Sequence, residues 1–205
     1  MKFFVIRAGQ TMWLRIAQIA SIATPLLHCV VLLITGQDAV RDPISELSRQ
    51  AWGVLHTVGL VLFGIAHVAL AIALGGLDRG RLWPYGRALL VASGATLFFI
   101  AYYFMNADPD TLSGPGANDP LWVVASLVGF AMGALQPGLS RLSRQLGLFS
   151  AVCLGIWLWL VPVILLVDDS WLGAYERIVG TVYVIWIFGV SSMLLQLKGD
   201  AGSRR

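Results

Sequence analysis

Residues with side chains capable of chemistry gather in one stretch of this sequence, residues 41–67, which reads RDPISELSRQAWGVLHTVGLVLFGIAH. Acidic, hydroxyl and basic side chains precede an apolar run, and the run itself carries His56 and His67. Imidazoles and carboxylates serve as zinc ligands and as acid/base catalysts. No tight metal-binding spacing such as HExxH is present. The stretch therefore marks a candidate site without specifying a reaction.

The composition places these groups in a membrane protein, because 58% of the 205 residues are hydrophobic and only 12% are charged. A transmembrane helix needs roughly 20 mainly apolar residues, so a chain of this length can hold six with short connections. We predict an all-α integral membrane protein, a six-transmembrane-helix bundle forming a single domain over residues 1–205. The expected spans are residues 12–36, 51–76, 88–106, 121–139, 147–167 and 177–197.

The distribution of basic residues predicts the orientation of this bundle. Eleven of the 14 Lys and Arg residues belong to the termini and to the loops after the second and fourth spans. Only Arg41, Arg49 and Arg177 lie on the opposite, outer face. Both termini are therefore expected in the cytoplasm. The basic residues behind the net charge of +3 then lie next to the anionic leaflet of the membrane. This placement indicates membrane lipids as partners and does not indicate nucleic acid.

Small and aromatic residues inside the spans are expected to serve packing. Gly129 and Gly133 form a GxxxG pair, which allows helices to approach closely, and we assign it to packing within the bundle. Trp157, Trp159 and Trp186 also fall inside spans, where core or lipid-facing packing is the expectation and a pocket lining the alternative.

One face of the second span carries His56, Gly59, Phe63 and His67 at helical spacing, and this face should point into the bundle. His67 lies near the midplane, where a Ser, a Thr or a backbone carbonyl can satisfy a neutral imidazole. His56 lies closer to the outer acids and to water, so it matters more if a polar site exists.

At the outer face the sequence predicts a polar cluster, and Arg177 is expected to pair there with Glu46 or, failing that, with Asp42. Glu176 is expected to face the bundle together with Gly180. No cofactor is predicted, and a bound metal ion is the weaker alternative. A structural polar network competes with both the catalytic-site and the metal-site interpretations. The cluster comprises Asp42, Ser45, Glu46, His56, Glu176 and Arg177; the candidate catalytic residues are His56, Glu46, Asp108 and Glu176; the candidate metal ligands are His28, His56 and Glu46.

Three short motifs carry a family resemblance: DPISELS before the second span, NADPD after the third, and GAYER at the start of the sixth. With them the chain resembles the uncharacterised bacterial six-helix membrane proteins of the family called domain of unknown function 998. The resemblance implies a multi-pass protein of the bacterial inner membrane, with Glu46, Glu176 and Arg177 on one outer face. It also implies a histidine near the start of the fourth helix, where this sequence has Trp122. The family has no established activity.

Two classes of function fit these observations. The first is a non-catalytic bundle that binds lipid or serves as an accessory subunit of a larger membrane complex. The alternative is an intramembrane hydrolase of a lipid-like substrate, with or without a metal, that uses His28 or His56 with Glu46, Asp108 or Glu176. Whether the protein is an enzyme stays open at this level.

Overall fold

The computed structural model describes residues 7–44, 47, 52–77, 79–106, 119–163 and 166–203. These residues form six α-helices and two short 3-10 helices, and they contain no strand. All six α-helices in the described part of the chain are long and apolar enough to cross a membrane. The prediction of an all-α, six-span protein is therefore confirmed. The helices are α1 (Ala8–Thr35), α2 (Gly53–Ala73), η2 (Leu74–Gly76), α3 (Trp83–Asn106), α4 (Asp119–Leu142), α5 (Arg144–Val163), η5 (Asp169–Trp171) and α6 (Leu172–Ser203).

Several helices begin before their expected spans, whereas α5 ends at Val163 rather than at residue 167. Helix α3 begins at Trp83 rather than at residue 88, and α6 begins at Leu172 rather than at residue 177. Hydropathy marks only the part that fits the hydrocarbon core, whereas backbone hydrogen bonding extends the helix into the interface. Helix α1 ends where expected, because Gly36 takes a left-handed conformation (φ 66°) and donates its N–H to the carbonyl of Leu32 at 3.0 Å.

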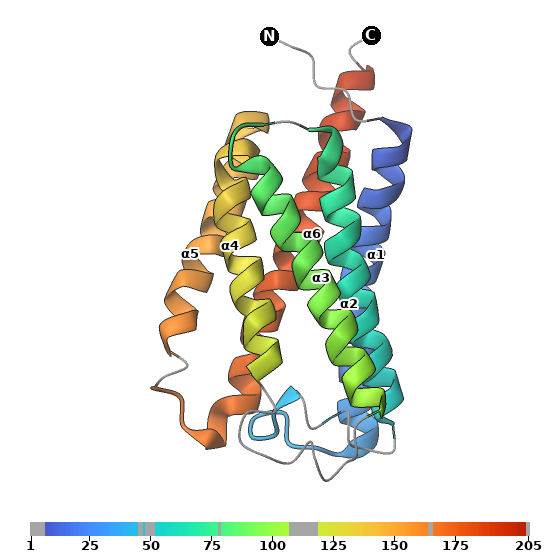
Figure 1. Cartoon of the computed structure of the whole chain (residues 1–205), viewed down its shortest axis with the longest axis vertical. Coiled ribbons are helices and arrows are strands. Elements are labelled where there is room, and N and C mark those ends of the chain that lie inside the picture. Colours follow the sequence, from blue (N-terminus) through green and yellow to red (C-terminus); the bar gives the residue numbers. More distant parts are fainter. Residues whose placement is uncertain are drawn as a thin grey trace.

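The helices form a closed ring, in which each helix packs against the next one in the chain and α6 returns to α1 (Figure 1). Helix α1 begins and α6 ends at the same end of the bundle, which we call the terminal end. At the opposite end, which we call the loop end, α1 finishes and α2 and α6 start. This arrangement brings the segment after α1 close to the first turns of α6.

Buried apolar side chains from every helix fill the ring, among them Leu14, Leu70, Leu97, Leu135, Leu146 and Trp186. Apolar side chains also cover the outside, as Trp159 shows with an exposed fraction of 72%. The two glycines of the GxxxG pair differ in their surroundings. A Cβ atom at Gly129 would overlap the indole of the buried Trp157 on α5, whereas a Cβ atom at Gly133 would meet nothing within 4 Å. Close packing in this motif therefore depends on Gly129.

Candidate functional site

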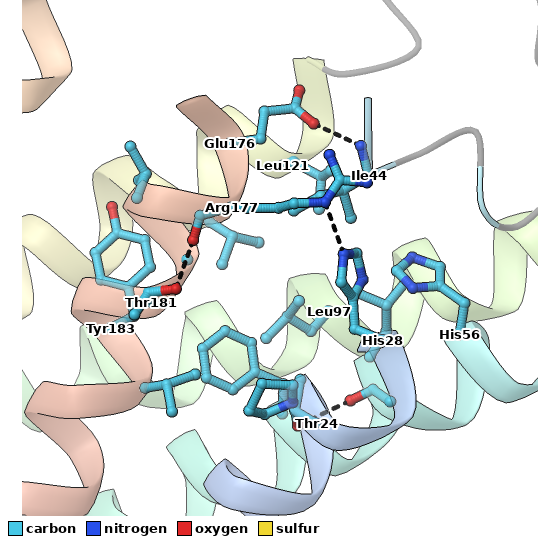
Figure 2. A pocket seen from close by; sticks show the side chains of 18 of the residues that line it. Thr24, His28, Ile44, His56, Leu97, Leu121, Glu176, Arg177, Thr181 and Tyr183 are labelled. Carbon is cyan, nitrogen blue, oxygen red and sulfur yellow. Dashed lines mark hydrogen bonds between the residues drawn. The ribbon is translucent and has the colours of Figure 1, made fainter. Parts of the chain in front are cut away.

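A pocket of about 320 Å³ lies inside the ring near its loop end (Figure 2). Its volume falls at the lower end of the range of about 300–1,000 Å³ that is usual for small-molecule sites. Residues from five helices line it: Thr24, Pro25 and His28 of α1, His56, Gly59 and Phe63 of α2, Leu97 of α3, Trp122 and Ala125 of α4, and Glu176, Arg177, Gly180, Thr181 and Tyr183 of α6. The face of α2 that the sequence predicted to point inward therefore contributes three of its four members, and His67 lies outside the lining.

Arg177 connects three segments at the polar end of the pocket. Its Nε donates a hydrogen bond to Nε2 of His28 at 3.1 Å, as Figure 2 shows. Its Nη1 donates to the carbonyl oxygens of Ala39 at 2.9 Å and Asp42 at 2.8 Å. Its Nη2 is buried and has no hydrogen-bond partner among the described residues. The guanidinium thus fastens α6 to the end of α1 and to the turn that follows it.

The contact with Arg177 fixes the tautomer of His28. A guanidinium N–H can only donate, so Nε2 of His28 accepts, and the proton of the neutral ring sits on Nδ1. The ring of His56 lies beside that of His28, with their centroids 5.5 Å apart and the planes at 61°. His56 is 4% exposed, and its buried Nε2 has no hydrogen-bond partner in the described part of the chain. The pocket therefore contains two adjacent imidazoles, one of which still offers a ring nitrogen.

The acidic residues near this end hold the backbone of the connecting segment. Glu176 is buried, and its Oε2 accepts the N–H of Ile44 at 2.7 Å. Asp42 accepts the N–H of Asp38 at 2.8 Å, and Asp38 in turn accepts the N–H of Val40 at 2.8 Å. The contact between Arg177 and Asp42 accordingly uses the main-chain carbonyl of Asp42. In the described part of the chain, Arg177 therefore contacts Asp42 through its backbone rather than through the expected carboxylate.

The pocket lining includes exposed residues of α1 and α6, namely Cys29 and Thr181, which indicates an opening between these two helices. The two helices are joined by the hydrogen bond between His28 and Arg177 and, nearer the terminal end, by one from Gln18 Nε2 to Ser192 Oγ at 2.7 Å. Between these two bridges the lining includes Pro25 and Thr181, and the side chain of Thr181 is exposed. Both residues lie within the apolar spans. The opening therefore faces the side of the bundle that lies in the membrane.

Apolar groups make up the rest of the wall, and the one phenol there is already hydrogen bonded. Tyr183 donates its hydroxyl to the carbonyl of Ala125 at 2.9 Å, and the same hydroxyl accepts the indole N–H of Trp157. Trp122, at the position where the family resemblance implies a histidine, lines the pocket, and its ring centroid lies 6.1 Å from that of Tyr175. Sequence reasoning missed Tyr183, because a tyrosine inside an apolar span carries no local signal that separates a pocket wall from a core.

His67 lies in the core beside the pocket. It is 0% exposed, and its Nδ1 donates to the carbonyl of Phe63 one turn earlier at 2.7 Å. The ring of Phe63 packs edge to face against it with centroids 4.5 Å apart. A backbone carbonyl of its own helix thus satisfies one nitrogen of this imidazole.

The structure brings together only part of the predicted cluster. His28, His56, Glu176 and Arg177 meet at the pocket, and Asp42 contacts it through its backbone. Ser45, Glu46 and Asp108 lie outside the described residues. Within the described ranges, no group of three or more His, Cys, Asp or Glu side chains is placed to hold a metal ion. A metal site built on His28, His56 and Glu46 stays a prediction, and the Nε2 lone pair of His28 is engaged by Arg177.

Comparison with known proteins identifies a family but no characterised relative. No curated protein and no solved structure matches the chain. The family model described as "Protein of unknown function (DUF998)" matches residues 16–193, which is most of the sequence. The match agrees with the resemblance carried by the DPISELS, NADPD and GAYER motifs. The chain is an integral membrane protein that belongs to the DUF998 family of unknown function.

Proposed function

We propose that this protein binds a lipid-like amphiphile, taking its apolar chain into the pocket and holding its polar group at Arg177 and His56. The observation that carries the proposal is the exposure of the lining residues Cys29 and Thr181 within the spans of α1 and α6, which indicates a sideways opening. A solute from water would reach a site at the mouth of the bundle, whereas this opening admits molecules already dissolved in the membrane.

The lining supports the same assignment. One end is polar, and the remaining wall is apolar, including Phe63, Leu97 and Trp122. Sites for small molecules are usually of this kind, mostly apolar with a few polar groups that fix orientation. An amphiphile matches both halves of the pocket, while a fully polar ligand would leave the apolar wall without contacts.

Hydrolysis of a lipid-like substrate is the second candidate. It is supported by Nε2 of His56, which has no hydrogen-bond partner among the described residues. A hydrolytic site also needs a nucleophile or a carboxylate within hydrogen-bond reach of such an imidazole. Of the candidate carboxylates, Glu176 accepts the N–H of Ile44, and Glu46 and Asp108 lie outside the described residues. We place binding first because the apolar wall of the pocket supports it directly.

We also propose that the terminal end lies in the cytoplasm of a bacterial inner membrane. The loops after α2 and α4 meet at this end, where Arg141 Nη1 donates to the carbonyl of Arg79 at 3.0 Å. These loops carry much of the basic charge of the chain, and cytoplasmic loops of membrane proteins are enriched in Lys and Arg.

Photolabelling of the purified protein in nanodiscs of zwitterionic lipid tests the binding proposal. Two probes with the same diazirine-bearing sixteen-carbon chain, one ending in a hydroxyl and one in a phosphate, are compared, and mass spectrometry locates the adducts. We expect at least one probe to label the lining segments of α1 and α6. Labelling by neither probe would contradict the proposal.

A matched pair of glycine variants provides the control. Gly180 lines the pocket and Gly155 faces outward, and a Cβ atom at either position would meet nothing within 4 Å. Gly180→Leu should reduce labelling about fivefold or more, because overpacking a filled site costs at least ~1 kcal/mol. Gly155→Leu should leave labelling unchanged. Equal labelling of both variants would show that the adducts form elsewhere.

A further inference from the structure

The apolar chain of a membrane ligand contributes little to its selection by the pocket. Transfer from the bilayer to an apolar cavity exchanges one hydrocarbon environment for another, so the hydrophobic effect gives almost no driving force. The free energy that distinguishes one amphiphile from another must then come from the polar end. The charge and hydrogen-bonding state of that end therefore decide the class of ligand.

Among the described residues, the positively charged guanidinium of Arg177 donates hydrogen bonds only to neutral groups. Its three hydrogen bonds within the described residues go to an imidazole nitrogen and two backbone carbonyls. The nearby carboxylates accept backbone N–H groups instead: those of Asp38 and Asp42 from their own turn, and that of Glu176 from Ile44. A guanidinium inside a membrane span is costly without a counterion in contact. Its remaining donor, Nη2, is buried and has no partner among the same residues, and Arg177 lines the pocket.

His56 supplies a second donor at the same end. Its side chain is only 4% exposed and lines the pocket. Its Nε2 has no hydrogen-bond partner in the described part of the chain. A neutral imidazole with its proton on Nε2 donates one hydrogen bond. Figure 2 shows Arg177, His28 and His56 gathered on one side of the pocket. Two unused donors, one of them charged, suit an acceptor with several anionic oxygens.

We infer that the ligand is an amphiphile with an anionic oxygen head, a phosphate or a carboxylate, which accepts hydrogen bonds from Arg177 Nη2 and His56 Nε2. This inference rests on the proposed function. His28 serves as a positioning residue, because it accepts from Nε of Arg177 and so fixes the orientation of the guanidinium.

Competition against the hydroxyl-ended photoprobe tests the charge of the head. Hexadecyl phosphate, hexadecanol and hexadecylamine share one chain length and are added at equal mole fractions in the nanodisc. We expect the phosphate to displace the probe at a mole fraction about tenfold or more below that of the alcohol, because charge-assisted hydrogen bonds are the stronger ones. The amine should compete least. Inorganic phosphate should not compete, since it lacks the chain.

Two histidine variants separate recognition of the head from general stability. His56→Phe removes a donor at the pocket, and His67→Phe removes an equally buried imidazole outside its lining. The advantage of the phosphate over the alcohol should fall several-fold in His56→Phe and persist in His67→Phe. Loss of the advantage only in His67→Phe would overturn the inference, as would a direct preference for the amine.

The outcomes distinguish the two levels of the proposal. If the alcohol and the phosphate compete equally while adducts still map to the pocket, the anionic head is wrong and amphiphile binding stands. If inorganic phosphate competes as well as its hexadecyl ester, the chain has no role and the proposed function fails. If neither photoprobe labels the pocket, both proposals fail.

Discussion

Replacing Gly129 by alanine should destabilise the bundle, because the new methyl group would overlap the indole of Trp157. Overpacking of this kind costs about 1–3 kcal/mol. Displacement of the indole would also weaken its hydrogen bond to the hydroxyl of Tyr183, worth about 0.5–1.5 kcal/mol. The higher helix propensity of alanine returns about 0.5–1 kcal/mol. The net loss should be on the order of 1–3 kcal/mol.

Thermal unfolding in detergent measures this loss against the other glycine of the motif. For a chain of this size 1 kcal/mol shifts Tm by about 2–4 °C, so Gly129→Ala should lower Tm by about 2–12 °C. Gly133→Ala meets no atom within 4 Å and should leave Tm unchanged or slightly raised. Adding Trp157→Leu should remove most of the extra penalty of Gly129→Ala, because the overlapping ring is gone. Equal Tm values for the two alanine variants would refute the steric reasoning.

Two further predictions concern orientation and the charge of the pocket. In a cysteine-free background, a thiol introduced at Ser113 should react with an impermeant reagent on intact cells and one at Ser143 should not; the opposite pattern would reverse the assigned sides. A double-mutant cycle on Arg177→Gln and Glu46→Gln without ligand should give a coupling above ~1 kcal/mol, the limit of exposed pairs, and saturation with hexadecyl phosphate should abolish it. Asp42→Asn should show no coupling to Arg177→Gln, because the contact uses a main-chain carbonyl that the variant keeps.

The sequence predicted the spans well because crossing a membrane requires length and apolar composition, and both are visible in one dimension. It could not predict which helices touch, because lipid-facing and core-facing side chains are equally apolar. Trp157 and Trp159 illustrate this, since they lie two residues apart on α5 and one is buried while the other is 72% exposed. Hydrophobic periodicity, which orients helices in water, is therefore weak in this chain.

The site was predicted in its residue types but only partly in its contacts. Pairing by opposite charge led to a carboxylate partner for Arg177, whereas the described partners are His28 and two carbonyls. Main-chain acceptors leave no trace in residue identity, and His28 lies 149 positions away in the sequence. The inward position of Glu176 was predictable from its helix, since adjacent residues point in different directions. The hydrogen bond that Glu176 accepts from the N–H of Ile44 could not be predicted, because it depends on the path of the connecting turn.

The closure of the ring by α6 on α1 also constrains how the protein is made. Translation proceeds at about 5–20 residues per second, so the 149 residues that separate His28 from Arg177 delay their hydrogen bond by roughly 7–30 s. During that interval the imidazole of His28 on α1 lacks its partner Arg177. The bridge between His28 and Arg177 is thus among the last contacts to form during biogenesis. A chain arrested before α6 would lack both this hydrogen bond and the part of the pocket wall that α6 supplies.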